Sequence, residues 1–383
     1  MVTLFIRLAA LLFMVLALTS CTTPQSTVRY DEIPFTERPK NIIFMVGDGM
    51  GLSQISAALY TNKNRLNLEY FPVVGFHKSY AANDLTTDSA AGATAFACGV
   101  KTYNNAIGVK KDTTPCYTIL EEAEDRGLAT GLIATATIVH ATPAAFIAHQ
   151  PLRVQYEQIA ADMLDVEVDL LIGGGKKYFD RREQDDRNLV AAFREKNYHV
   201  YDYMDRHLSQ IPFNPKNNLI YFTADKHPVP VAAGRDYLSF AAKLSPYFLE
   251  RRSDQGFFLV IEGSQIDWMS HSNDAQGAIR ETLDFDRAVG EVLDYARKKG
   301  NTLVIVTADH ETGGLALNPG SRMGKIEGAF TTNGHTAALI PVFAFGPGAE
   351  LFSGIYENTS IHTKMRAALG FDIGTALTDS PNR

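Results

Sequence analysis

Residues 41–51 read NIIFMVGDGMG, and this stretch decides the fold. Residues 41–46 form a short uninterrupted apolar run, which is typical of a strand buried on both faces of a parallel sheet. Three glycines follow, with Asp48 between the first two. A dinucleotide-binding fingerprint needs G-x-G-x-x-G, but Leu52 occupies its last position. The motif therefore predicts a carboxylate presented to a cation at a strand end, since a structural turn would explain the glycines but not the acid.

Similar apolar runs recur along the chain and alternate with amphipathic segments. The runs are 128–134, 168–172, 218–222, 257–261, 303–307 and 341–345, and the helix candidates are 51–60, 89–98, 116–126, 151–164, 187–196, 236–250, 275–299 and 359–369. This alternation predicts an α/β fold, a three-layer α/β/α sandwich with a large, mostly parallel central sheet. Open sheets of this kind bind ligands at the carboxyl ends of their strands. Reactive residues are therefore expected directly after the apolar runs.

Residues 86–95, TTDSAAGATA, are a run of small residues that opens a helix. Ser89 would lie at the helix N-terminus, where free N–H groups and the helix dipole favour an anion. The same pattern also fits a capping Asp or Ser before a tightly packed Ala/Gly helix. These residues alone leave both interpretations open.

Three further clusters carry metal-ligand residue types. Asp267 and His271 stand four residues apart and would share one face of a helix. Asp309-His310 follows the run 303–307, and His335 comes later in G-H-T. Imidazole nitrogen and carboxylate oxygen are ligands that zinc accepts, and catalytic zinc sites keep one position open. The clusters predict a metal site, with a buried salt-bridge network as the alternative.

Together these motifs resemble the alkaline phosphatase family, in its bacterial lipoprotein form. The motifs G-D-G-M, T-D-S-A-A, H-A-T-P-A-A-F-I-A-H with Arg153 beyond it, E-G-S-Q-I-D-x-x-x-H, T-A-D-H-E-T-G-G and G-H-T occur in the family's order. The resemblance covers residues 40 to about 370. It implies a phosphomonoesterase that uses two zinc ions and one magnesium ion, forms a phosphoserine and releases inorganic phosphate.

The resemblance also assigns residues to these roles. Ser89 is similar to the nucleophile, and Arg153 to the arginine that binds two phosphate oxygens. The implied ligands are Asp267, His271 and His335 for the first zinc, Asp48, Asp309 and His310 for the second, and Asp48, Thr142 and Glu262 for magnesium. A phosphodiesterase or sulfatase of the same superfold, or a non-catalytic lipoprotein that binds metal or phosphate, remain alternatives.

Two positions around these ligands depart from some bacterial members. His140 stands where those members have an acid, and Trp268 stands where they have Lys. The combination resembles marine and cold-adapted members, so we expect weaker phosphate retention, and the identity of the third metal stays open. Five other histidines are expected to have no catalytic role: His77, His149, His207, His227 and His362.

The N-terminus has the features of an export signal. Arg7 precedes eleven apolar residues, too few for a transmembrane helix, and Leu18-Thr19-Ser20-Cys21 resembles a lipobox. Lipidation of Cys21 would hold the protein on the periplasmic or outer face of a bacterial membrane, although an ordinary secretory signal is the alternative. The expected parts are a signal peptide (1–20), a flexible tether (21–38), one catalytic domain (39–375) and a tail (376–383). Cys98 and Cys116 then remain, and an oxidising compartment would allow them to pair.

The charge of the chain excludes one class of partner. Its 36 basic and 43 acidic residues give a net charge of −7, and removal of the segment with Arg7 leaves −8. Nucleic acid as a specific partner is therefore unexpected, because phosphate-backbone binding needs a basic surface. Small phosphate monoesters are the expected substrates, provided that metal ions reverse the local field, and a homodimer stays open.

Overall fold

The predicted strands form one central sheet in residues 34–371, the part of the chain that the computed structural model describes. Its ten strands are β1 (Asn41–Gly47), β2 (Val73–Lys78), β3 (Ala129–Thr137), β4 (Leu170–Gly174), β5 (Tyr198–Asp202), β6 (Asn218–Phe222), β7 (Phe257–Gly263), β8 (Thr302–Thr307), β13 (Ile340–Phe345) and β14 (Gly354–Glu357). Their order is β14-β2-β13-β8-β1-β7-β3-β4-β6-β5. β13 alone among these strands runs against its neighbours. The prediction of a mostly parallel sheet is confirmed.

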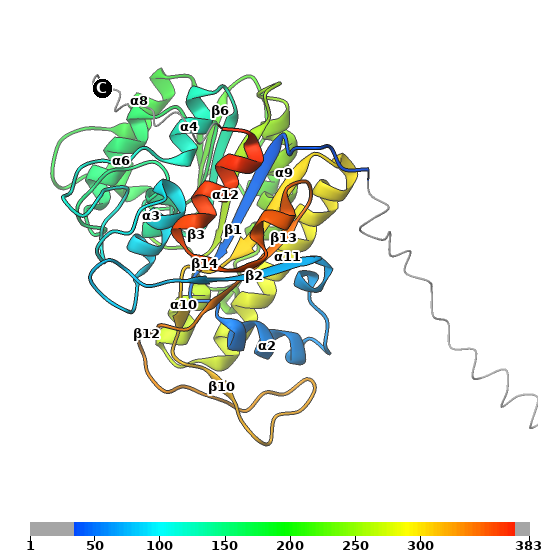
Figure 1. Cartoon of the computed structure of the whole chain (residues 1–383). Helices are drawn as coiled ribbons and strands as arrows, with labels where there is room; N and C mark the ends of the chain where they lie inside the picture. Colours follow the sequence, from blue (N-terminus) through cyan, green and yellow to red (C-terminus); the bar gives the residue numbers. More distant parts are fainter. Residues whose placement is uncertain (1–33, 372–383) are drawn as a thin grey trace, which may run out of the picture. The chain divides into compact units, whose positions relative to one another are not determined.

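Helices cover both faces of this sheet (Figure 1). They are α2 (Leu52–Thr61), α3 (Ser89–Cys98), α4 (Ile119–Asp125), α5 (Ala141–Ala144), α6 (Tyr156–Asp165), α7 (Lys177–Asp180), α8 (Leu189–Glu195), α9 (Tyr237–Glu250), α10 (Gln265–His271), α11 (Ala275–Lys299) and α12 (Thr359–Leu369). α9 and α11 pack on one face, and α3, α4, α6, α8 and α12 join the hydrophobic core on the other. The three-layer prediction is therefore confirmed. β1, β7 and β8 lie between the layers and are buried along their whole length, which explains their continuous apolar sequences.

Short elements complete the connections. They are the 3₁₀ turns η2 (Asn67–Tyr70), η3 (Leu208–Gln210), η4 (Val231–Ala233) and η5 (Ala349–Phe352), and the two-residue strands β9 (Glu311–Thr312), β10 (Ala316–Leu317), β11 (Gly328–Ala329) and β12 (His335–Thr336). β9 pairs with β12, which brings His335 opposite Thr312. This small pairing places a late segment of the chain beside the end of β8.

Part of the expected tether makes defined contacts with the catalytic domain. Residues 35–38 belong to the expected tether, but Phe35 packs edge-to-face against Phe345, and the backbone N–H of Thr36 donates to the carbonyl of Gly300 at 3.0 Å. A half-buried aromatic side chain that packs on Phe345 and a satisfied backbone donor together hold this segment in place. The expected signal peptide, Cys21 and the tail lie outside the described residues.

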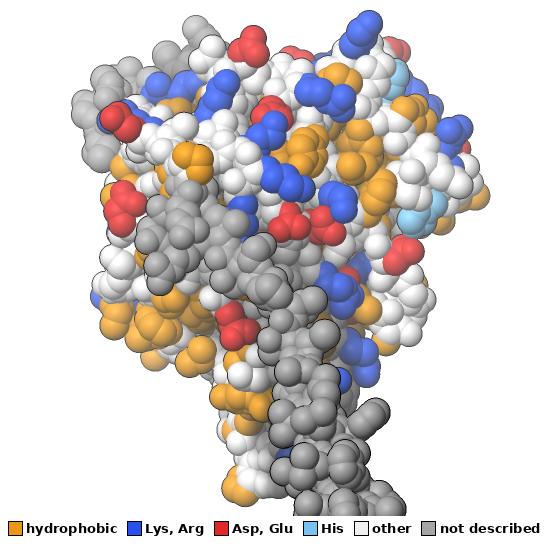
Figure 2. Space-filling model, turned by 90° about the vertical axis from the view of Figure 1, so that its right-hand side faces the viewer, with side chains coloured by type: hydrophobic (Ala, Val, Ile, Leu, Met, Phe, Trp, Pro, Cys, Tyr) orange, Lys and Arg blue, Asp and Glu red, His pale blue; other side chains and the backbone are white. Residues whose placement is uncertain are grey.

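Figure 2 shows Lys and Arg side chains interspersed with Asp and Glu on one face, with hydrophobic side chains between them. No helix among the described residues is long and apolar enough to cross a bilayer.

Candidate active site

The predicted metal-ligand residues meet at the carboxyl edge of the sheet. Asp48 directly follows β1, Glu262 lies near the end of β7, and Asp309 follows β8. These three strands are neighbours, with β1 in the middle. Residues from three distant parts of the sequence are thus brought together, as the rule for open sheets requires.

Ser89 lies among the first group of ligands. Its Oγ is 3.4 Å from Asp48 Oδ2 and 3.4 Å from His310 Nε2. His310 Nε2 is also 3.5 Å from Asp48 Oδ1 and 3.3 Å from Asp309 Oδ2. Asp48, Asp309 and His310 are fully buried, and each offers one ligand atom within 4.8 Å of the others. The expected second zinc set therefore converges on the hydroxyl of Ser89.

A second group forms beside the first. Asp267 Oδ1 lies 3.3 Å from His271 Nε2 and 3.6 Å from His335 Nε2, and the two imidazole nitrogens are 3.0 Å apart. The helix α10 does place Asp267 and His271 on one face. His310 also contributes to this group, because its ring stacks on that of His335 with centroids 3.5 Å apart. His310 thus links the two groups.

The third group contains one residue more than the sequence assigned. Asp48 and Glu262 present ligand atoms within 4.8 Å of one another together with His140. The expected ligand Thr142 is buried in α5, and His140 is the residue at the N-terminal cap of that helix. His140 was expected near the ligands, and the structure places it among the candidate ligands themselves.

The orientation of the imidazoles suits metal binding. His271 Nδ1 lies 2.6 Å from the carbonyl of Asn333, and His335 Nδ1 lies 2.8 Å from the carbonyl of Thr87. A carbonyl oxygen only accepts, so each Nδ1 carries a proton and each Nε2 can offer its lone pair to the cluster. Backbone carbonyls therefore fix the tautomers that metal ligands need.

The carboxyl groups are strongly perturbed. Burial, and then repulsion from Asp309, Asp267 and Glu262, raises the pKa of Asp48 well above its usual value. Burial raises the pKa of Glu262 to about 7, and burial followed by repulsion from Asp267 raises that of Asp309. Asp309 Oδ2 and Glu262 Oε1 are buried without a hydrogen-bond partner among residues 34–371. Buried carboxylates with unused oxygens fit cations, so the residues suit the metal ions that the family implies.

Asp267 behaves differently because imidazoles surround it. Burial would raise its pKa, but the hydrogen bond with His271 and the nearby His310 and His335 outweigh burial and lower it. The same hydrogen bond raises the pKa of His271 to about 9. Without a metal, a proton on His271 therefore compensates the carboxylate.

Arg153 lies at the edge of the cluster and is fixed by two neighbours. Its Nη1 donates to Asp88 Oδ2 at 3.1 Å, and its Nη2 lies 3.3 Å from His140 Nε2. Only Arg153 can donate in the second contact, because a guanidinium has no acceptor. The guanidinium is thus held beside the helix that carries Ser89.

The capping interpretation of the small-residue run is confirmed, and Ser89 stands at the helix start as the other interpretation expects. Asp88 caps α3, accepting from the backbone N–H of Ala91 at 3.0 Å, so Ser89 is the first helical residue. The helix also packs closely, because a Cβ at Gly92 would lie 3.1 Å from Asp309 Cβ. Gly49 is constrained similarly: its φ is +72°, and a Cβ there would lie 2.8 Å from Asp267 Cα. Glycines in these motifs allow the ligand-bearing segments to approach one another.

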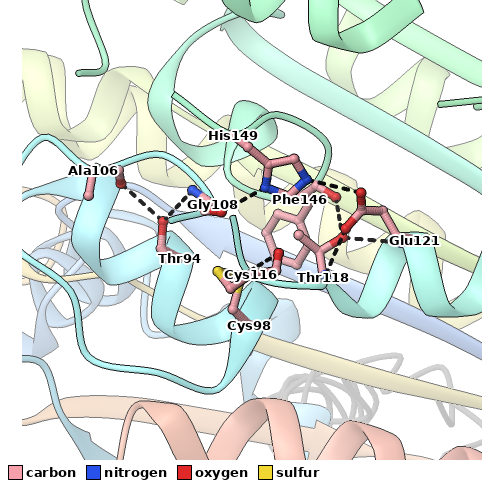
Figure 3. The surroundings of a disulfide bond; sticks show 9 residues. All are labelled: Thr94, Cys98, Ala106, Gly108, Cys116, Thr118, Glu121, Phe146 and His149. Atoms are coloured by element: carbon pink, nitrogen blue, oxygen red, sulfur yellow. Dashed lines mark hydrogen bonds and ion pairs between the residues drawn. A yellow bond between two sulfur atoms is a disulfide. The ribbon is translucent and has the colours of Figure 1, made fainter. Parts of the chain in front are cut away.

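A disulfide ties the far end of α3 to the following loop (Figure 3). Cys98 and Cys116 are bonded, with Cα atoms 5.9 Å apart. Nearby, His149 bridges the carbonyl of Gly108 at 2.7 Å and the carboxyl of Glu121 at 3.0 Å. These contacts give His149 a structural role and anchor the helix that begins at Ser89.

The sequence did not indicate one further residue beside the site. His227 lies edge-to-face against Trp268, with ring centroids 4.7 Å apart, and 5.8 Å from the ring of His140. Its Nδ1 accepts from the backbone N–H of Thr137 at 3.2 Å. His227 stands in the long connection between β6 and α9 without a flanking motif, so only the folded chain reveals its position.

Comparisons with known proteins agree with this geometry. Residues 39–327 match the family model described as alkaline phosphatase. Alkaline phosphatase 3 of Bacillus subtilis is 32% identical over 93% of this chain and 95% of its own length. Among solved structures, the alkaline phosphatase from the Antarctic bacterium TAB5 is 41% identical, with a TM-score of 0.82 over 88% of this chain and 99% of that one. A variant of the TAB5 enzyme in which a histidine is replaced by aspartate has Mg bound in its M3 site.

Proposed function

Since this chain belongs to the alkaline phosphatase family and is therefore a phosphatase, we propose that it hydrolyses phosphate monoesters through a covalent intermediate on Ser89. The observation that carries this proposal is the position of the Ser89 hydroxyl, 3.4 Å from both Asp48 and His310. A protein that only stored metal or phosphate would need no hydroxyl at this point.

The residues have the following roles in the two steps of the reaction. Ser89 Oγ attacks phosphorus, an Oγ–P bond forms, and the bond from phosphorus to the alcohol oxygen breaks as the alcohol leaves. Water then attacks the phosphoserine, so inorganic phosphate departs and Ser89 regains its proton. Arg153 binds two phosphate oxygens as a planar fork, a geometry that Lys cannot reproduce. The free N–H groups at the start of α3 would favour the same anion.

We assign two zinc ions and one magnesium ion to the three groups of ligands. Asp267, His271 and His335 would hold one zinc, and Asp48, Asp309 and His310 the other. Asp48, Thr142 and Glu262 would hold magnesium. Bound there, the ions supply Lewis-acid stabilisation of the attacking and leaving oxygens.

The third site should prefer magnesium less than an all-oxygen site does. Magnesium favours oxygen ligands, whereas imidazole suits zinc, and His140 lies among the candidate ligands of this site. The magnesium in the aspartate variant of the TAB5 enzyme supports this inference. The substitution His140→Asp should accordingly increase the amount of magnesium that stays bound to the protein after dialysis.

Ser89→Ala tests the covalent mechanism. We expect loss of p-nitrophenyl phosphate hydrolysis and of the phosphoserine trapped by acid quenching, with Ser56→Ala in α2 as the control at wild-type activity. Full activity of Ser89→Ala would contradict the mechanism. Faster turnover of bis-p-nitrophenyl phosphate or p-nitrophenyl sulfate than of the monoester would instead favour a diesterase or a sulfatase.

We further propose export and lipid anchoring at Cys21. The apolar run 8–18 and the lipobox-like sequence that ends at Cys21 support this assignment. Cys21→Ser should move the phosphatase from the membrane fraction to the soluble fraction after cell lysis and abolish labelling by a fatty-acid analogue. An unlabelled, soluble wild-type protein would point to an ordinary secretory signal.

A further inference from the structure

His77 occupies a position that the proposed mechanism does not use. It lies in β2 and its side chain is fully buried. Its Nε2 is 2.8 Å from the carbonyl oxygen of Ala308. Because a carbonyl only accepts, Nε2 carries the proton and donates to Ala308. Ala308 immediately precedes the ligand pair Asp309-His310.

The sheet itself offers no donor from the opposite strand position. β13 pairs with β8 so that Phe343 faces Val306, and continuing this register places Pro341 opposite Ala308. Proline has no backbone N–H, so it cannot donate to the Ala308 carbonyl. A buried carbonyl that lacks good donors is costly. The hydroxyl of Thr307 donates to the Ala308 carbonyl at 3.4 Å, and the imidazole of His77 supplies the shorter bond, at 2.8 Å.

The ring of His77 is held by its surroundings. It packs edge-to-face against Phe96 of α3, with centroids 5.4 Å apart. Burial lowers the pKa of His77 to about 4, so the ring is neutral at physiological pH. His77 therefore contacts both the helix that begins at Ser89 and the peptide that precedes Asp309.

We propose that His77 is a positioning residue: it fixes the Ala308 peptide and thereby orients the side chains of Asp309 and His310 toward the metal that they would bind. This inference rests on the proposed function, which assigns those two residues as ligands. Groups that orient metal ligands typically change metal affinity by about 10- to 100-fold when they are removed. Since His77 acts through one backbone carbonyl, the lower end of that range is expected.

The test is a zinc titration of the metal-free protein in competition with a chromogenic chelator. His77→Phe keeps a buried ring but removes the donor, and we expect Zn²⁺ to bind at least one site about tenfold more weakly. His77→Gln places an amide N–H near the position of Nε2 and should restore most of the affinity. Melting curves of each metal-free variant report folding independently of metal binding.

His362→Phe is the matched control. His362 is another largely buried histidine whose pKa burial lowers to about 4, but its backbone partners, Phe96 and Ala97, belong to α3. It should destabilise the fold without weakening zinc binding. Wild-type zinc affinity in a folded His77→Phe, equal loss in His77→Gln, or equal loss in His362→Phe would each overturn the role of His77. His310→Ala in the same titration tests the proposed function separately, because it should remove zinc binding at the site shared with Asp48 and Asp309 whatever His77 does.

Discussion

Two clusters of buried charged side chains in this protein balance their charge in different ways. In the first, Arg235 of the β6–α9 connection donates through Nη2 to Glu281 at 2.5 Å and to Asp284 at 2.9 Å. The other carboxylate oxygens accept from the backbone N–H of Val231 and from Arg287. Every carboxylate oxygen in this cluster therefore has a partner from the chain itself.

The second cluster is the candidate active site, where the chain supplies too few cations. Four carboxyl groups belong to it: Asp48, Glu262, Asp267 and Asp309. Arg153 is the nearest guanidinium, and it already donates to Asp88. The carboxylate oxygens of the first cluster are therefore satisfied once the chain folds, whereas those of the second would need cations from outside the chain. A pocket with three divalent ions would carry a positive charge and suit a phosphate dianion, although the whole chain is acidic.

Metal removal should separate the two clusters most clearly. Dialysis against EDTA should lower p-nitrophenyl phosphate hydrolysis by at least about 1,000-fold, because Ser89 loses its activation and the carboxylates repel the substrate. Zinc with magnesium should restore the activity. It should also raise the melting temperature, by an amount that corresponds to about 4 kcal/mol at a thousandfold excess over Kd.

Calcium is the control for this experiment, since it prefers oxygen ligands and a larger coordination number. It should not restore activity to the metal-free protein. If the protein stays fully active after elemental analysis shows that its metals are gone, the candidate site does not depend on them.

Arg235→Leu should instead damage stability and leave the chemistry intact. The substitution leaves Glu281 and Asp284 buried without their main cation, which typically costs about 3–5 kcal/mol. The midpoint of urea unfolding should fall accordingly. The molecules that remain folded should keep the wild-type kcat, because the cluster belongs to the α9–α11 layer.

Arg287→Leu provides the comparison for that loss. Its side chain is 58% exposed, so its ion pair with Asp284 is screened by solvent and should contribute little. Equal destabilisation by the two substitutions would show that burial does not distinguish the two arginines.

The difference between fully buried and partly exposed strands explains which parts of the fold could be predicted from the sequence. β1, β7 and β8 were predicted because burial on both faces requires continuous apolar runs. β5 and β14 were missed: β5 alternates buried and half-buried residues, and β14 is mostly exposed or half-buried. β2 was missed because Gly75 and His77 interrupt its apolar pattern.

The candidate ligands could be predicted for a similar reason. Asp48 and Asp309 directly follow apolar runs, and Asp267 and His271 have helical spacing, so short-range rules are sufficient to find them. His77 and His227 could not be found in this way. Their positions depend on the order of strands in the sheet and on the path of a long connection, which short sequence motifs do not encode.

The zinc affinity of the candidate active site should depend on pH. The hydrogen bond with Asp267 raises the pKa of His271 to about 9, so metal-free protein holds a proton that zinc must displace below that pH. Affinity for zinc should rise by about tenfold per pH unit from pH 7 to 9 and then level off. Chelator competition at each pH, corrected for the titration of the chelator, measures this slope.

His271→Asn should bind zinc more weakly at every pH and show a slope reduced by one proton. Identical zinc affinity of the wild type at pH 7 and pH 9 would mean that His271 does not bind the metal or is not protonated in its absence.

Trp268→Lys should produce the smallest change, because it adds one protein cation to a cluster that lacks them. Trp268 lies half-buried between His140 and His227, with ring centroids 5.9 and 4.7 Å away. A lysine there should lower the inhibition constant of inorganic phosphate severalfold, or about 1 kcal/mol, since solvent screens much of the added attraction. Inhibition of p-nitrophenyl phosphate hydrolysis by phosphate measures it.

Trp268→Met separates the charge from the loss of the indole. It removes the contacts with both histidines without adding a cation, so the inhibition constant should stay near the wild-type value or rise. If the Lys and Met variants bind phosphate equally well, the shortage of protein cations in this cluster does not limit phosphate retention. Added sodium chloride should weaken phosphate binding more in the Lys variant than in the Met variant, because only the former gains a charge that salt can screen.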